Sequence, residues 1–364
     1  MDHKTTNTIS DHLNIIWTIA SKDIVDALKS KVVVSMIIML SLILLMPKML
    51  PLIFEQSQTV LPVYDMGDSH LMAELITTPD ISIQKLRSEQ ELQTALCSAV
   101  YPLIGLRIPA DFDQAIVAGG QVEIQGSVCW SKRHKVSGLQ LKLEEMLSQA
   151  LDQPVAIHIE GNIVYPPSDG VLLLSIVNIN SVLMILMMGI FLVPSLLIEE
   201  KETKTMQALL VSPASISQVV VGKALAGLFY ILVTAVMVFT ISWAEVIHWD
   251  TVLLFVIGGG FFSVAVGLVL GSFCEKQQDM VGWMTALLLL QLGAIFAKML
   301  GMELPTLVEN ILPWVPSVAL AEICRVSFSE AVPTAQVLTN LGIVLAVSLM
   351  LYALVVWKVR RSDR

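Results

Sequence analysis

Unbroken apolar runs divide this chain, and each is long enough to cross a membrane. A hydrocarbon core of about 30 Å needs roughly 20 helical residues, and about six runs reach that length. They cover residues 32–54, 171–198, 216–243, 251–273, 280–300 and 335–357. The pattern predicts a polytopic α-helical membrane protein with about six transmembrane helices.

Between the first two runs, over residues 55–170, short apolar strands alternate with amphipathic helices. The predicted strands cover residues 60–64, 81–84, 103–108, 122–130 and 155–159. The predicted helices cover residues 70–77, 88–99, 111–118 and 137–149. Ser88, with Glu91 three residues later, fits a capping box. We therefore expect a folded α/β domain, inserted between the first and second transmembrane helices.

Residues 1–31 precede the first run and show a helical period. Apolar side chains recur there at steps of three and four residues: Leu13, Ile16, Trp17, Ala20, Ile24 and Leu28. Because this segment leads directly into a span, we expect an amphipathic helix in the cytoplasmic membrane interface, with Trp17 toward the lipid. Packing of the same face in a soluble core is the alternative.

The orientation follows from lysine and arginine in the short flanks of the runs. Segments 1–31, 198–223, 274–279 and 358–364 carry twelve of these residues, whereas the short loops on the other side carry only Arg325. Basic residues favour the cytoplasmic side. The distribution predicts that both termini are cytoplasmic, that residues 358–364 form a cytoplasmic tail, and that residues 55–170 lie outside.

Composition excludes two classes of protein. The chain is 55% hydrophobic with a mean hydropathy of +0.74, which argues against a soluble enzyme. The net charge is −9, so the basic surface of a nucleic-acid-binding protein is missing. Residues 55–170 alone hold 15 acidic and 7 basic side chains, a net charge of −8. The acidity therefore belongs to the predicted external domain.

Two features of that domain stay open from the sequence. Cys97 and Cys129 could form an extracellular disulfide, but their spacing does not show that they approach each other. A basic cluster at 132–135, beside Trp130, could contact an anionic substrate or a lipid headgroup. We expect it instead to be a solvated loop, the commoner fate of such a run. No catalytic or metal-binding motif is recognisable, and no metal site is expected.

The segment from Ile198 to Lys223 reads IEEKETKTMQALLVSPASISQVVVGK and lies on the predicted cytoplasmic side. Its charged residues come first, and apolar residues then follow on one helical face. Pro213 ends this helix, and Ser215 is placed to cap the next. The pattern predicts a short amphipathic helix at 199–212, which could rest on lipid or fit a groove on a soluble partner.

This segment resembles a motif of the permeases of ATP-binding-cassette (ABC) type 2 exporters, E-[KR]-E-x-[GK]-T-x-x-x-L-L-x-[ST]-P followed by G-K. The matching residues here are Glu200-Lys201-Glu202, Thr205, Leu209-Leu210, Ser212-Pro213 and Gly222-Lys223, with Lys204 in place of the usual glycine. Ser21-Lys22-Asp23 stands where the family often has a basic-acidic pair. The external domain is similar to that of a subgroup that includes sodium- and drug-export permeases.

The resemblance implies a transporter subunit that is not itself an enzyme. A separate ATPase subunit would bind ATP and Mg, and this chain itself would need no cofactor; it contains no GxxxxGK[ST] loop. Segment 199–212 would be the coupling helix on that ATPase. Its contact residues would be Glu199, Glu200, Lys201, Glu202, Thr205, Met206, Leu209, Leu210 and Pro213. A second permease copy would complete the unit, as a homodimer or a heterodimer with a paralogue, in the inner membrane of a prokaryotic cell.

Three uncharged amides inside the runs are candidates for the transport pathway: Asn178, Asn180 and Gln291. Amides in spans more often bond neighbouring helices, which is the competing interpretation. Gly259, Ser263, Gly267 and Gly271 form a small-residue stripe that predicts close helix packing. Residues 302–334 are apolar but broken by prolines, and the family has re-entrant external helices at this place.

The predicted function is export of a substrate from the cytoplasm or the inner leaflet, driven by ATP hydrolysis on the partner. The alternative is a membrane-anchored external binding or sensory protein without transport. It would need no ATPase dock, so segment 198–214 distinguishes the two. An intramembrane enzyme is a third possibility, but no nucleophile–base or metal constellation supports it. No residue identifies the substrate.

Overall fold

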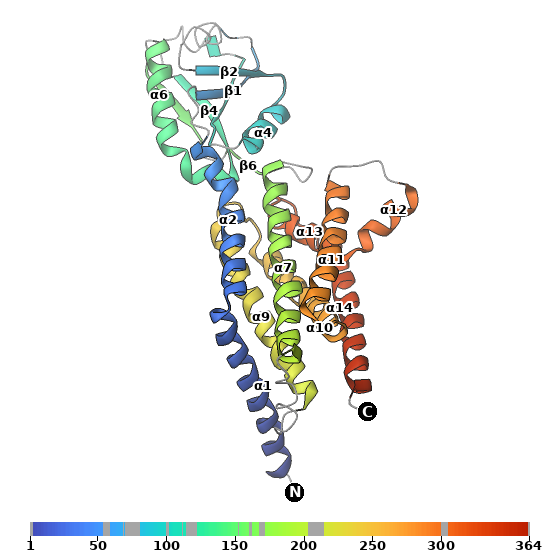
Figure 1. Cartoon of the computed structure of the whole chain (residues 1–364). Coiled ribbons are helices and arrows are strands. Elements are labelled where there is room, and N and C mark those ends of the chain that lie inside the picture. The colour runs from blue at the N-terminus through green and yellow to red at the C-terminus, as the bar shows by residue number, and fades with distance from the viewer. Residues whose placement is uncertain are drawn as a thin grey trace.

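A computed structural model describes residues 3–53, 59–67, 69, 81–99, 102–110, 112–113, 122–151, 153–159, 162–166, 172–202, 215–299 and 305–362. It consists of a helical bundle and a sheet domain, the latter formed by residues 59–166 (Figure 1). Both chain ends lie at the end of the bundle away from the sheet domain (Figure 1). The predicted helix at 70–77 and most of that at 111–118 fall outside the described residues.

The long helices of the bundle coincide with the apolar runs. They are α2 (Lys31–Ile53), α7 (Leu172–Glu202), α9 (Ile216–Ile241), α10 (Trp249–Phe273), α11 (Gln277–Met299) and α14 (Thr334–Ser362). Before them comes α1 (His3–Lys29), separated from α2 by Ser30 alone. Ser215 caps α9 and forms a capping box with Gln218, so the predicted cap at this position is confirmed.

Within the described residues, five helices are long and apolar enough to cross a membrane: α7, α9, α10, α11 and α14. In α2 the apolar stretch that can be assessed is shorter, Val33–Ile43. A bent pair at Thr306–Trp314 and Pro316–Val326 would make a further span if the two parts were counted together. The protein is thus a multi-pass membrane protein with five or six membrane-capable helices.

The bent pair consists of α12 (Thr306–Ile311) with η2 (Leu312–Trp314), followed by α13 (Pro316–Val326). The two parts meet at an angle of 67°. Nearly all of α13 is buried, and it packs against α7, α10, α11 and α14. Ser317 Oγ donates a hydrogen bond of 3.2 Å to the carbonyl oxygen of Gln291. Gln291 lies about two turns before the end of α11. A bent pair of this kind is either a broken span or a re-entrant loop, so the re-entrant helices that the resemblance implies stay a prediction.

Among the described helices, α7 and α10 share the most extensive contact, and their small residues explain it. Gly189 of α7 lies against Ser263 of α10, and Gly267 of α10 lies against the backbone of Gly189. Gly271 meets Leu197 and Pro194 in the same way. The predicted role of the small-residue stripe in helix packing is confirmed.

The described strands of the sheet domain form a six-stranded sheet: five follow the order β2-β1-β3-β4-β5, and the short β6 pairs with β4 beside this path. The strands are β1 (Thr59–Asp65), β2 (Ile81–Leu86), β3 (Gly105–Ile108), β4 (Val122–Cys129), β5 (Val155–His158) and β6 (Ile163–Val164). Among the described strand pairs, β3 with β4 is antiparallel and the others are parallel. The described strands and helices therefore confirm the predicted α/β class and lie within a few residues of the predicted positions.

Alternate residues of the strands supply two cores on opposite faces of the sheet. Leu61 and Val63 of β1 pack with α6 (Ser137–Leu151), whereas Val60 and Tyr64 pack with α4 (Glu89–Ser98). Ser88 caps α4 by accepting a hydrogen bond from the Glu91 amide at 3.2 Å. The Glu91 carboxylate accepts from the Arg87 amide, one residue earlier than in a standard capping box.

Cys97 of α4 and Cys129 at the end of β4 form a disulfide, with their Cα atoms 5.1 Å apart. Both lie in the core beneath α4. The sequence left this pairing open, because 32 residues separate the two cysteines. Cys274 and Cys324 are free and buried in the bundle.

We expect removal of this disulfide to destabilise the sheet domain by about 2–4 kcal/mol, since it closes a loop of moderate length in the unfolded chain. In denaturant without reductant, a thiol titration should detect the two free cysteines, and all four after reduction. Reductant should lower the protease resistance of the wild-type domain and leave a Cys97→Ala/Cys129→Ala variant unchanged. Four reactive thiols before reduction would contradict the pairing.

The prediction of a solvated loop at 132–135 is wrong for half of the cluster. These residues form η1 (Trp130–Lys135), where Lys132 is buried and Arg133 is half-buried. Arg133 Nη1 donates to the carbonyl oxygen of Ala244 in the bundle, 3.2 Å away. The cluster is therefore the place where the sheet domain meets the bundle, because folding brings residues 111 positions apart into contact.

Candidate functional site

The predicted coupling segment begins at the end of α7, on the same side of the bundle as the chain ends (Figure 1). Helix α7 continues through the charged residues to Glu202, four residues beyond the predicted apolar run. Glu199 is exposed there, and Glu200 lies in the helix. The other predicted contact residues lie outside the described residues: Thr205, Met206, Leu209, Leu210 and Pro213.

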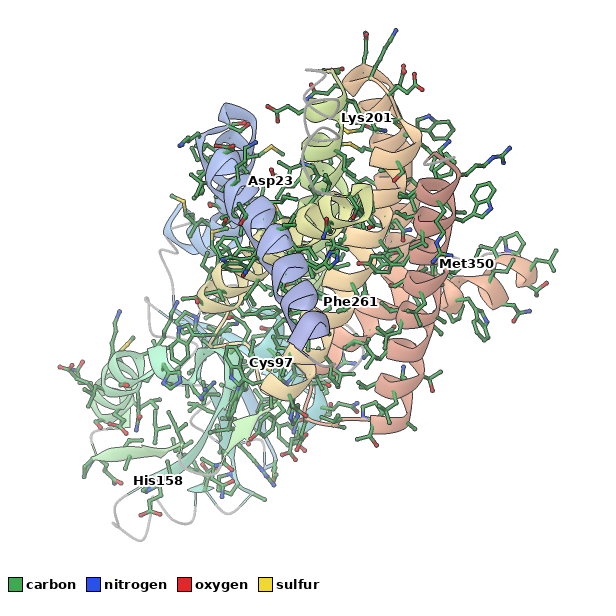
Figure 2. All side chains as sticks on the ribbon, turned by 90° about the horizontal axis from the view of Figure 1, so that it is seen from below. Asp23, Cys97, His158, Lys201, Phe261 and Met350 are labelled. Atoms are coloured by element: carbon green, nitrogen blue, oxygen red, sulfur yellow. A yellow bond between two sulfur atoms is a disulfide. The ribbon has the colours of Figure 1, made fainter. Side chains whose placement is uncertain are left out.

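Lys201 closes the C-terminal end of α10. Its Nζ donates hydrogen bonds to the carbonyl oxygens of Gly271 and Cys274, at 2.7 and 3.1 Å. The last carbonyls of a helix have no intrahelical partner and carry partial negative charge, so an ammonium group is favourable there. Figure 2 shows Lys201 in the bundle, away from Cys97 and His158 in the sheet domain.

Glu202 acts in the complementary way on the next helix. Its Oε1 accepts a hydrogen bond from the Gln277 amide at 2.9 Å, at the first residue of α11. A carboxylate at a helix N-terminus satisfies an orphan amide and interacts favourably with the helix dipole. Lys201 and Glu202 together fix the turn between α10 and α11 to the end of α7.

The sequence did not predict that Lys201 and Glu202 of the motif make contacts inside the bundle. The partners lie 70 to 75 residues away, so no local spacing could indicate them. They leave the predicted role of these residues at an ATPase surface untested. The two residues hold the ends of α7, α10 and α11 together.

On the other side of this segment, α9 is joined to α1 by buried polar contacts. Lys223 Nζ lies 3.1 Å from Asp23 Oδ2, and the two side chains are only 1% and 8% exposed. Tyr230 donates its hydroxyl to the carbonyl oxygen of Ile24 at 2.5 Å, and Gly222 gives Ile19 room to approach. The ion pair joins the two short motifs noted in the sequence, Ser21-Lys22-Asp23 and Gly222-Lys223.

The face of α1 that packs on α9 coincides only in part with the predicted apolar face, because Ala20 belongs to both. Ala20, Asp23 and Ala27 are buried, whereas Leu13 and Trp17 stay 61% and 67% exposed. Small side chains let the two helices approach closely, which decides the buried face. The exposed side chains leave an apolar stripe on α1, so the predicted contact of Trp17 with lipid stays a prediction.

The candidate pathway amides occupy three different environments. Asn178 Nδ2 donates to the carbonyl oxygen of Ala321 in α13 at 3.1 Å, a helix-joining contact. Asn180, two residues further along α7, is half-buried and points to a different side of the helix. The Oε1 atom of Gln291 is buried without a hydrogen-bond partner among the described residues. No hydrogen bond within the described part of the chain joins these three amides, and their role in a pathway stays a prediction.

Between α13 and the end of α11, one carboxylate is shared by two cations. Glu322 of α13 lies 3.3 Å from Lys298 of α11 and 2.8 Å from Arg325. The carboxylate is mostly buried and the cations are partly exposed. These three residues tie the C-terminal half of α13 to the C-terminal end of α11.

The fold and this site define a multi-pass helical membrane protein with a sheet domain at one end and a charged helix-end segment at the other. A protein-family profile described as "ABC-2 family transporter protein" matches residues 32–357. The chain therefore belongs to the ABC-2 family and is an ABC permease subunit, a non-catalytic membrane component of a transporter. A search of curated proteins finds no match to the chain.

Proposed function

We propose that this protein is the permease subunit of an ABC exporter, which moves a substrate out of the cytoplasm or the inner leaflet. A separate ATPase subunit binds ATP and Mg and supplies the energy. The family match over residues 32–357 carries this proposal. The charged end of α7, where Lys201 and Glu202 fix the α10–α11 turn, supports a coupling role for segment 199–212.

We also propose the orientation that this function requires. The chain crosses the inner membrane of a prokaryotic cell six times, with both termini and the coupling segment in the cytoplasm and the sheet domain outside. The basic flanks support this orientation, as do the chain ends at the end of the bundle away from the sheet domain (Figure 1). The Cys97–Cys129 disulfide is consistent with an oxidising compartment.

In this arrangement, ATP-driven closure of the ATPase displaces the coupling segment, and the contacts of Lys201 and Glu202 pass the movement to α10 and α11. Two permease copies and two ATPase subunits form the unit, as a homodimer or with a paralogous permease. The bent helices α12 and α13 close the outer end of the pathway. Asn178 donates to the backbone of α13, and Gln291 accepts from Ser317 of α13 with its backbone carbonyl, which supports a position of both residues near the outer end of the pathway.

Co-purification with a Walker-type ATPase, which would be sought first in the adjacent reading frames, tests the docking. We expect a Glu200→Gln/Leu209→Ala variant to lose association at least tenfold, because it removes a polar and an apolar contact worth about 1–2 kcal/mol or more at an interface. A matched control, Glu309→Gln/Leu307→Ala on the exposed α12, should bind as wild type. Undiminished association of the first variant would contradict the docking site; no association of the wild type would favour the non-transporting alternative.

A further inference from the structure

The sheet domain is joined to the bundle by a compact set of contacts, which we call the joint. It consists of Lys132, Arg133 and His134 of η1 and of residues 243–245 in the turn between α9 and α10. Arg133 Nη1 donates to the Ala244 carbonyl oxygen at 3.2 Å. The rings of His134 and Trp243 lie with their centroids 5.0 Å apart.

On its domain side, the joint is held rigidly. The Arg133 guanidinium lies 3.6 Å above the Trp130 ring and donates to the Trp130 carbonyl oxygen at 2.6 Å. The Trp130 ring stacks on Tyr165. The cation–π contact and the hydrogen bond together orient the Arg133 guanidinium toward the Ala244 carbonyl oxygen.

Lys132 anchors the same turn to the core of the sheet domain. Its Nζ donates to the carbonyl oxygens of Leu96 and Ala99 at the end of α4, next to the disulfide. Burial lowers the pKa of Lys132 to about 8, and the Glu245 carboxylate across the joint acts against this shift. A movement of the sheet domain must therefore move η1 with it.

On its bundle side, the joint continues into α13. Within three residues of Glu245, the amides of Ile247 and His248 both donate to the carbonyl oxygen of Ser327, at 2.8 and 3.1 Å. Ser327 is the C-terminal cap of α13 and is fully buried. His248 Nε2 also lies 3.2 Å from the Glu330 carbonyl oxygen. One turn of chain thus contacts the sheet domain with one end and holds α13 with the other.

We propose that the sheet domain sets the position of α13 through the joint, so that a change at the external domain reaches the outer closure of the bundle. The residues that carry this link are positioning residues: Arg133 and His134 on the domain, and the 243–248 turn on the bundle. The mechanical link stands on the contacts alone. Its consequence, control of substrate release, rests on the proposed function.

Hydrogen–deuterium exchange of the full-length protein in lipid nanodiscs tests the link. An Arg133→Ala/His134→Ala variant should raise exchange at the end of α13 and at 327–330 by roughly tenfold, the factor for losing one hydrogen bond to a charged donor. Lys135→Ala/Lys142→Ala, at exposed positions of the same domain, is the control and should leave these amides unchanged. Arg133→Lys should give an intermediate increase in exchange, since lysine keeps the positive charge but lacks the planar, forked donor group of the guanidinium.

A purely local role for η1 would raise exchange in η1 and in the 243–248 turn and leave α13 unchanged; that result overturns the proposal. Strands β1 to β5 report whether the sheet domain is still folded. If the double variant unfolds it, the Arg133→Lys variant and Trp243→Ala, which acts from the bundle side, provide the same readout. The hydrogen–deuterium exchange measurement needs no ATPase, so its result would stand even if the export model failed. Unchanged exchange in α13 would contradict the link even if the protein proved to be an exporter.

Discussion

A Gly267→Ala substitution is expected to destabilise the bundle by about 3 kcal/mol, the upper end of the usual cost of overpacking. The added Cβ would overlap the carbonyl oxygen of Gly189 and lie 2.9 Å from Cβ of Val193. A backbone atom cannot turn away as a flexible side chain can, so α7 and α10 must separate. Because α7 and α10 share the most extensive contact among the described helices, the whole bundle should respond.

Thermal unfolding of the purified protein in detergent measures this effect. Gly293→Ala on α11 is the matched control, because no atom lies within 4 Å of its added Cβ. Alanine is about 1 kcal/mol better than glycine in an exposed helix, so this control should be as stable as wild type or more so. Equal stability of the two variants would show that α7 and α10 do not approach as described.

The second large effect is expected at the ion pair between α1 and α9. Lys223→Met leaves the Asp23 carboxylate buried without its cation, a change that costs about 3–5 kcal/mol in comparable buried pairs. We expect α1 to leave α9 and become sensitive to limited proteolysis. Figure 2 shows Asp23 within the bundle, beside the helices on which α1 packs.

Two further variants make this prediction specific. Asp26→Asn, three residues along α1, removes an exposed carboxylate 4.0 Å from Lys29 and should have little effect. Asp23→Leu/Lys223→Met removes both charges, and we expect it to recover most of the loss, since no unpaired charge remains. Additive effects of the two single substitutions would mean that the pair does not couple the helices.

The features that could be predicted from the sequence are those whose interacting residues lie close together along the chain. The helix and strand positions followed from hydrophobic periodicity, because each residue's burial repeats within a few positions. Ser88 and Ser215 were recognised as caps because the groups they satisfy lie three residues away. The stripe through Gly267 indicated close packing, but its partner helix could not be read from one helix alone.

The candidate site was only partly accessible in the same way. The motif around Glu200 indicated a docking segment by resemblance, and that role remains a prediction. The internal roles of Lys201 and Glu202 were missed, because their partners lie at the ends of α10 and α11. A run of charges usually lies in a solvated loop, so the sequence predicts one at 132–135, whereas the structure buries Lys132 and half-buries Arg133.

The sequence by itself determined the class of this protein: an apolar chain with membrane-length helices, an acidic inserted α/β domain, and a charged segment typical of ABC permeases. Those features depend on composition and on short-range periodicity. Only the tertiary structure decided the disulfide, the Asp23–Lys223 pair and the joint through Arg133. Each of these joins residues that lie 32 to 200 positions apart, and their meeting depends on how whole elements pack.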